Sequence, residues 1–160
     1  MRVLQVAAHD GDAATLAWLI ARYEAAESEH ERMNVLTAMG CFADSDVQGQ
    51  ALSWVLDTVP DRIRFLPIAM AAANPAMVGG IWSWYVDHRE RLENGHPLLY
   101  ERIIASVVPV GGMADPDAVR AFCKKLAARP QAPVAAIRLS LEKLEINLRL
   151  RAAAGKHPRP

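Results

Sequence analysis

The segment PVAAIRLSLEKLEINLRLRAAA, residues 133–154, decides the fold. Its apolar residues Ile137, Leu141, Leu144 and Leu148 follow one another at intervals of four, three and four, which places them on one side of an α-helix. The charged residues Glu142, Lys143, Glu145 and Arg149 face elsewhere. The segment therefore predicts one long amphipathic helix that must bury its apolar side against other helices.

Helical periodicity continues through nearly the whole chain, and the strict alternation typical of strands is scarce. Most of the predicted helices begin at a proline or at a side chain that can cap a helix, as at Asp12, at Ser28 with Glu31 three residues later, and at Asn74 before a proline. The predicted helices cover residues 10–26, 28–40, 44–60, 67–73, a segment from 75 that carries Ile81 to Leu92, 97–108, 116–128 and 133–154.

The connections between these helices are short, so successive helices must run antiparallel and pack side by side. We therefore predict an all-α fold of stacked antiparallel helical hairpins that form a HEAT/armadillo-like right-handed superhelix. No sequence motif repeats at a fixed period. Residues 1–154 are expected to form a single helical-repeat-like domain, and residues 155–160 a flexible tail that is basic and rich in proline.

Composition excludes several classes of partner. The 160 residues include 18 Lys or Arg and 18 Asp or Glu, so no net charge attracts nucleic acid or anionic lipid. Residues 1–5 carry a single arginine and lead into no apolar segment of the kind found in a signal peptide. The long uncharged stretch at residues 65–85 is interrupted by prolines and glycines, so no membrane span is predicted. Cys41 and Cys123 stand alone in apolar surroundings, which favours reduced packing residues and a cytoplasmic location.

One short motif resembles part of a zinc site. In His30-Glu31-Arg32-Met33-Asn34, a metalloprotease helix would carry a second histidine at the position of Asn34, and an amide is a much weaker zinc ligand than imidazole. The other histidines, His9, His88, His96 and His157, have no partner three or four residues away. We therefore predict no metal ligand and no cofactor in this chain.

Other candidate functional features have simpler structural interpretations. Glu142 and Glu145 share a helix face, but neighbouring basic residues can pair with them. Trp82 and Tyr85 share another face and Trp84 lies elsewhere, so the three cannot surround a cation. Trp82 is expected to be largely buried. The glycine pairs at 79–80 and 111–112 indicate connections or close helix contacts, and we predict no catalytic or cofactor-binding residue.

Four segments, in order, resemble one family. Glu31-Arg32 followed by Leu36-Thr37-Ala38-Met39-Gly40 is similar to a charged pair before an L-x-A-L-G helix, with Met39 in place of leucine. Asn74-Pro75 is followed by Gly79 and Trp82. The third segment is Met113-Ala114-Asp115 with Val119 and Phe122. The last, Glu142 to Leu150, is similar to a terminal E-x-I-x-x-N-I-x-W helix, with Leu150 in place of tryptophan.

These segments, which span roughly residues 7–151, resemble the C-terminal domain of the gluzincin zinc aminopeptidases, the group that includes puromycin-sensitive aminopeptidase, the endoplasmic-reticulum aminopeptidases and aminopeptidase N. The resemblance implies a bowl of helices that closes over an upstream thermolysin-like catalytic domain and shapes the access of peptide substrates. The family's G-A-M-E-N and H-E-x-x-H motifs do not occur here. At Ala73, where some members carry a basic residue, no peptide-binding residue can be transferred.

Two hypotheses therefore remain. In the first, the chain is the non-catalytic C-terminal domain of an aminopeptidase whose zinc is bound by the upstream domain. In the second, the chain is a free-standing helical-repeat adaptor whose concave face binds a protein. In both cases the isolated chain is not expected to be an enzyme.

Overall fold

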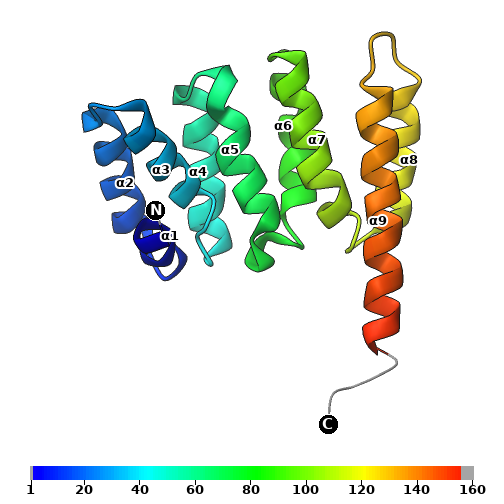
Figure 1. Ribbon diagram of the computed structural model, residues 1–160, viewed down its shortest axis with the longest axis horizontal. Coiled ribbons are helices and arrows are strands. Elements are labelled where there is room, and N and C mark those ends of the chain that lie inside the picture. Colours follow the sequence, from blue (N-terminus) through cyan, green and yellow to red (C-terminus); the bar gives the residue numbers. More distant parts are fainter. Residues whose placement is uncertain (1, 156–160) are drawn as a thin grey trace.

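The computed structural model describes residues 2–155, and this part of the chain is entirely helical (Figure 1). It contains nine α-helices and one short 3-10 helix: α1 (Arg2–His9), α2 (Ala13–Ala25), α3 (Glu29–Met39), α4 (Ser45–Thr58), α5 (Asp61–Ala73), η1 (Pro75–Met77), α6 (Ile81–Glu93), α7 (Pro97–Gly111), α8 (Pro116–Ala127) and α9 (Val134–Gly155). The predicted all-α class is confirmed.

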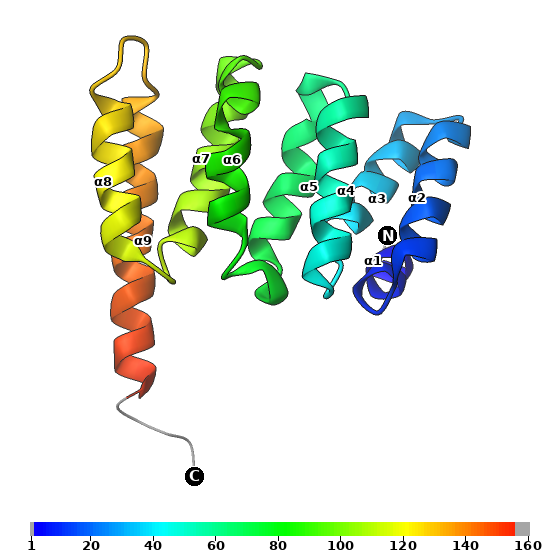
Figure 2. The same cartoon turned by 180° about the vertical axis from the view of Figure 1, so that it is seen from behind.

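The helices form a row of antiparallel hairpins, α2–α3, α4–α5, α6–α7 and α8–α9, that follow one another in sequence order. The odd-numbered helices lie in one layer and pack on one another along the whole row, from α1 on α3 to α7 on α9. The even-numbered helices form the other layer and are more widely spaced (Figure 2). This arrangement confirms the repeat-like architecture, while the right-handed sense of the superhelix stays a prediction.

Several predicted helix limits were wrong. The helix expected at residues 10–26 begins only after Asp12, and the sequence analysis missed α1 before it. The helix expected at 67–73 begins at Asp61, so Pro67 lies inside α5. Asn74-Pro75 opens one turn of 3-10 helix, and α6 starts only at Ile81. α9 continues through Gly155, which had been assigned to the tail; residues 156–160 of that tail lie outside the described residues.

The hydrophobic core runs along the row in two clusters that meet at α4. Leu36, Met39 and Phe42 belong to the N-terminal cluster, and Tyr85 and Ile104 belong to the C-terminal one. α4 contributes to both, because neighbouring positions on its buried side face different helices. The two clusters therefore adjoin along α4, while the single-domain organisation stays a prediction.

The aromatic residues of α6 are arranged differently from the prediction. Trp82 is half-buried; its ring lies 5.5 Å from that of Tyr85 and 5.1 Å from that of Phe122, measured between centroids. Trp84 is the buried tryptophan of this helix, and its ring stacks on His88 at 4.8 Å. Trp82 was predicted to be largely buried, but it is only half-buried because α8 covers only part of its side chain.

Glycines allow the close approach of helices at two places. A Cβ atom on Gly111 would lie 2.8 Å from the Cβ of Trp82, and one on Gly112 would lie 2.4 Å from a methyl carbon of Leu144. The glycine pair at 111–112 therefore makes close helix contacts, which is one of the two predicted roles, the other being a connection between helices. The described helices include none with both the length and the apolar composition of a membrane span.

Candidate functional site

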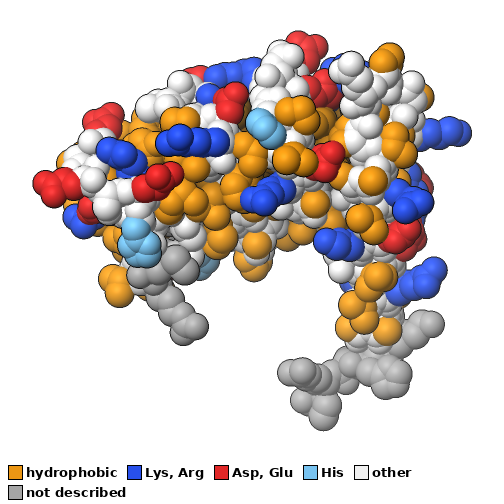
Figure 3. Space-filling model, turned by 45° about the horizontal axis from the view of Figure 1, so that its top comes forward, with side chains coloured by type: hydrophobic (Ala, Val, Ile, Leu, Met, Phe, Trp, Pro, Cys, Tyr) orange, Lys and Arg blue, Asp and Glu red, His pale blue; other side chains and the backbone are white. Residues whose placement is uncertain are grey.

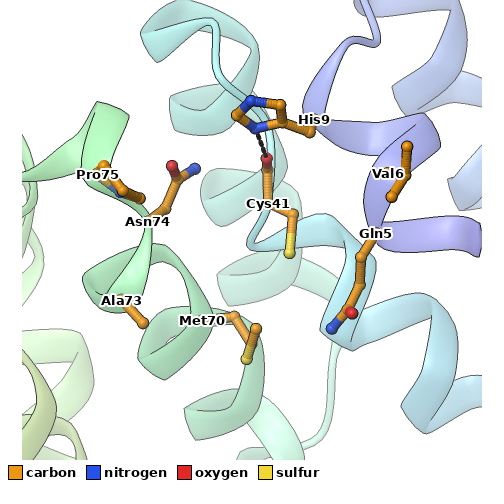
Figure 4. Close-up of a pocket in the computed structure, with 8 residues that line it drawn as sticks. All are labelled: Gln5, Val6, His9, Cys41, Met70, Ala73, Asn74 and Pro75. Atoms are coloured by element: carbon orange, nitrogen blue, oxygen red, sulfur yellow. Dashed lines mark hydrogen bonds between the residues drawn. The ribbon is translucent and has the colours of Figure 1, made fainter. Parts of the chain in front are cut away.

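A largely apolar groove lies in the layer of odd-numbered helices, near the N-terminal end of the row (Figure 4). It has a volume of about 460 Å³. One wall is α1, the other is the C-terminal end of α5, and the loop after α3 lies between them. The lining residues are Gln5, Val6, His9, Cys41, Met70, Ala73, Asn74 and Pro75.

Two buried amides fix the loop between these walls. The side chain of Gln48 donates a hydrogen bond to the carbonyl oxygen of Met39 at 2.8 Å and accepts one from the backbone N–H of Phe42 at 3.0 Å. The side chain of Asn74 donates to the carbonyl oxygen of Phe42 at 2.7 Å. Each amide thus pairs backbone groups that the end of α3 leaves without helical partners. The groove is consequently built on rigid backbone.

α3 and α5 also pack unusually closely beneath the groove. Gly40 is fully buried, and a Cβ atom there would lie 2.5 Å from both the Cβ of Met70 and the carbonyl oxygen of Pro67. Only glycine permits this approach without a shift of the backbone. The glycine that ends the motif Leu36 to Gly40 therefore has a physical role, which is to bring the end of α3 next to α5.

The lining is mostly apolar, with the polar side chains of Gln5, His9 and Asn74 and no acidic, Lys or Arg residue. The Nδ1 atom of His9 lies 3.3 Å from the carbonyl oxygen of Cys41, and the thiol of Cys41 donates to the carbonyl oxygen of Thr37 at 3.3 Å. Burial raises the pKa of the Cys41 thiol, so it stays protonated near neutral pH and is a poor nucleophile. The groove is suited to binding, not to covalent catalysis.

Ala73 lies on the wall of this groove, next to Asn74. Alanine adds no charge and leaves the volume open. The groove of this chain therefore favours an uncharged, apolar ligand group over an anion.

The sequence analysis assigned no catalytic, metal-binding or cofactor-binding residue. Within residues 2–155, no three His, Cys, Asp or Glu side chains are close enough together to hold a metal ion. His30 is exposed at the start of α3, and Asn34 follows one turn later.

Glu142 and Glu145 do not form a carboxylate pair. Glu145 accepts from Arg120 at 2.6 Å, whereas Glu142 lies 3.9 Å from Arg138. These contacts agree with the interpretation of a surface charge face.

Sequence reasoning missed a polar cluster between the α6–α7 and α8–α9 connections. The hydroxyl oxygens of Tyr85 and Tyr100 are 2.7 Å apart, and Tyr100 donates to Glu93 at 3.1 Å. Arg129 reaches both oxygens of Glu93 at 2.9 Å. Burial is the largest cause that raises the pKa of each tyrosine well above its usual value, so both stay neutral. The cluster joins the last two hairpins.

A comparison with protein-family models places most of the chain in one family. The family model "ERAP1-like C-terminal domain" matches residues 1–146. The chain belongs to this family. Membership in the ERAP1-like C-terminal domain family confirms the resemblance to the C-terminal domain of zinc aminopeptidases. No curated protein and no solved structure showed a significant match to the chain.

The ERAP1-like match ends at Ile146, inside α9. It includes the whole groove and both amides that support it, because all of these residues precede position 146.

Proposed function

We propose that this chain is the non-catalytic C-terminal domain of a zinc-dependent aminopeptidase, where it covers the active-site chamber and shapes the access and selection of peptides. The family match over residues 1–146 carries this proposal. The zinc belongs to an upstream thermolysin-like catalytic domain, which is the main partner of this domain. Peptide substrates are the second partner, and the expected location is the cytoplasm.

The groove gives the proposal its chemical content. A peptide that extends from a catalytic centre into a covering domain meets that domain through its side chains and its backbone. The lining supplies apolar surface from Val6, Met70 and Ala73, with the amide of Gln5 at the edge for the peptide backbone. A volume of about 460 Å³ accommodates a large aliphatic or aromatic side chain. The domain would thus favour peptides that place such a residue in the groove.

The alternative is a free-standing helical-repeat adaptor. One observation favours it: the helices stack in a single row, and the groove opens in its layer of odd-numbered helices. Extended layers of stacked helices commonly serve as protein-binding surfaces. In both functions the groove is the binding site. The functions differ in whether a catalytic domain is attached to this chain.

The coding sequence upstream of Met1 distinguishes the two functions. An uninterrupted frame that contains the zinc-binding motif supports the aminopeptidase, whereas a stop codon supports the adaptor. In the aminopeptidase, deletion of this domain should broaden or weaken peptide selection without loss of zinc. The isolated chain should contain no stoichiometric zinc and release no amino acid from aminoacyl-coumarin or aminoacyl-anilide substrates. Stoichiometric zinc together with chelator-sensitive turnover would contradict the proposal.

A further inference from the structure

The overall charge balance conceals a strong asymmetry along the row of helices. Residues 1–61 contain ten acidic and three basic residues, whereas residues 116–155 contain three acidic and eight basic residues. Because the hairpins stack in sequence order, these two segments form opposite ends of the molecule. One end of the row is therefore acidic and the other is basic.

The basic end exposes an apolar face on α9. Leu139, Ile146 and Leu150 are 53%, 55% and 63% exposed, and intervals of seven and four residues place them on one side of the helix. This side is opposite to the buried side of α9, which packs on α7 and α8. Two basic residues, Lys143 and Arg149, and one acidic residue, Glu142, lie beside the face. Hydrophobic and basic side chains are both visible along the α9 column at the right of Figure 3.

The acidic end exposes a complementary face on α2. Trp18 is 49% exposed, and its ring lies 5.8 Å from the guanidinium carbon of Arg22. Helical spacing places three exposed alanines on the same side of α2, away from the buried Leu16 and Leu19. These alanines are Ala14, Ala21 and Ala25. The exposed acidic residues near the two ends of α2 are Asp10, Asp12, Glu24 and Glu27.

The two faces are complementary in size, and the two ends that carry them are complementary in net charge. The α9 face presents large aliphatic side chains, and the α2 face presents small ones around a single ring, a combination that lets two helices approach closely. The basic residues beside the α9 face would meet the acidic residues beside the α2 face. We propose that the partner of the α9 face is the α2 face of a second copy of this chain, so that copies associate head to tail.

This contact joins two different surfaces, so each added copy leaves one free face at either end and open chains form. One pair of helices buries less than the roughly 1,200–2,000 Å² of a standard stable interface, so we expect association only at about 100 µM or above. Charges contribute to it, and raising the salt to about 0.5 M should weaken it several-fold by screening.

Sedimentation velocity over a concentration series tests the association. The 160-residue chain should form dimers and longer species as its concentration rises toward about 500 µM at low salt, and fewer of them at high salt. A chain that stays monomeric under these conditions would overturn the proposal.

Variants at each end test the geometry. Trp18→Lys removes the ring and places a cation opposite the basic end, and the double variant Ile146→Gln with Leu150→Gln removes most of the α9 face. Each should lower the association constant at least about tenfold. Leu98→Gln, at a side chain that is 62% exposed in α7 and far from both ends, is the matched control and should change nothing. Helical circular dichroism should be the same for all variants.

Mixing the two blocked variants gives the sharpest result. The Trp18→Lys chain keeps its α9 face and the double-glutamine chain keeps its α2 face, so an equimolar mixture should form dimers that do not grow, although each variant alone is monomeric. If the mixture stays monomeric, or if only the α9 variant loses association, the contact is not head to tail and the proposal fails.

Discussion

Gly40 and Pro67 lie so close that a Cβ atom on Gly40 would come within 2.5 Å of the carbonyl oxygen of Pro67. The contact places α3 on α5, and the apolar groove is built over this junction. It also explains why Pro67 is tolerated inside α5. Proline is disfavoured inside a helix because it has no N–H to donate to the helix. Pro67 is buried beside the end of α3, and this tertiary packing outweighs the local preference against proline.

Gly40→Ala should destabilise the protein by about 2–3 kcal/mol, since the added methyl group meets backbone that cannot move freely. The backbone of Gly40 has φ −89°, which alanine also adopts, so the cost is steric and not conformational. Gly49→Ala is the matched control: nothing lies within 4 Å of its Cβ position in α4. It should stabilise by about 0.5–1 kcal/mol through helix propensity. Urea unfolding of both variants measures the difference, and equal effects would contradict the close contact.

Gln48→Ala should cost about 2–4 kcal/mol, because it leaves the carbonyl oxygen of Met39 and the N–H of Phe42 buried without partners. Gln50, two residues later in the same helix, is exposed. Gln50→Ala should therefore change the free energy of unfolding by less than about 0.5 kcal/mol. Hydrogen exchange adds a local reading, since the N–H of Phe42 should lose protection in the Gln48 variant. Retained protection would show that the amide does not fix this loop.

Trp82→Ala should cost about 3 kcal/mol, the lower end of the range for buried aromatic side chains, because the ring packs on Tyr85 and Phe122 but is only half-buried. Trp18→Ala, at the exposed tryptophan of α2, should cost less than about 1 kcal/mol. Guanidinium unfolding compares the two. A cost for Trp82 that is no larger than the cost for Trp18 would show that the α6–α8 contact contributes little to stability.

Alkaline pH should destabilise the fold partly through Cys123. Burial raises the pKa of its thiol from 9.0 to about 11, so between these values the unfolded chain loses the proton while the folded chain keeps it. Stability from this group is fully present below pH 9 and is lost as the pH rises toward about 11. Tyr85 and Tyr100 act in the same direction. In Cys123→Ala the free energy of unfolding should fall less steeply above pH 9 than in the unaltered chain, and an unchanged slope would contradict the assignment.

Local signals in the sequence identified the capping residues of several helices. Asp12, Ser28 and Asp115 each accept a hydrogen bond from a backbone N–H in the first turn of the helix that follows. Such caps depend on residues two or three positions apart, which a sequence displays directly. The all-α class followed from the periodicity of the apolar residues, most clearly at residues 133–154.

The groove and the tyrosine cluster were not predictable in this way. The groove joins Val6 to Ala73, and the cluster joins Glu93 to Arg129, a pair separated by 36 positions. No local spacing records such contacts, because they depend on how the hairpins stack. Pro67 misled the prediction for the opposite reason, since a strong local signal for a helix start was overruled by packing.

Methionine methyl NMR of the isolated chain tests the central claim most directly, namely that the groove holds the apolar part of a peptide. Met70 lines the groove and Met113 lies near α9, so the two methyl groups report on the site and on a distant control. Addition of a peptide with large aliphatic side chains, up to about 1 mM, should shift the Met70 resonance and leave that of Met113 in place. The shift should be absent in Ala73→Trp, which fills the groove, and for a peptide that carries carboxylates at the same positions. A Met70 resonance that does not move would contradict the account. So would equal shifts of Met70 and Met113 in the unaltered chain, or a Met70 shift that persists in Ala73→Trp.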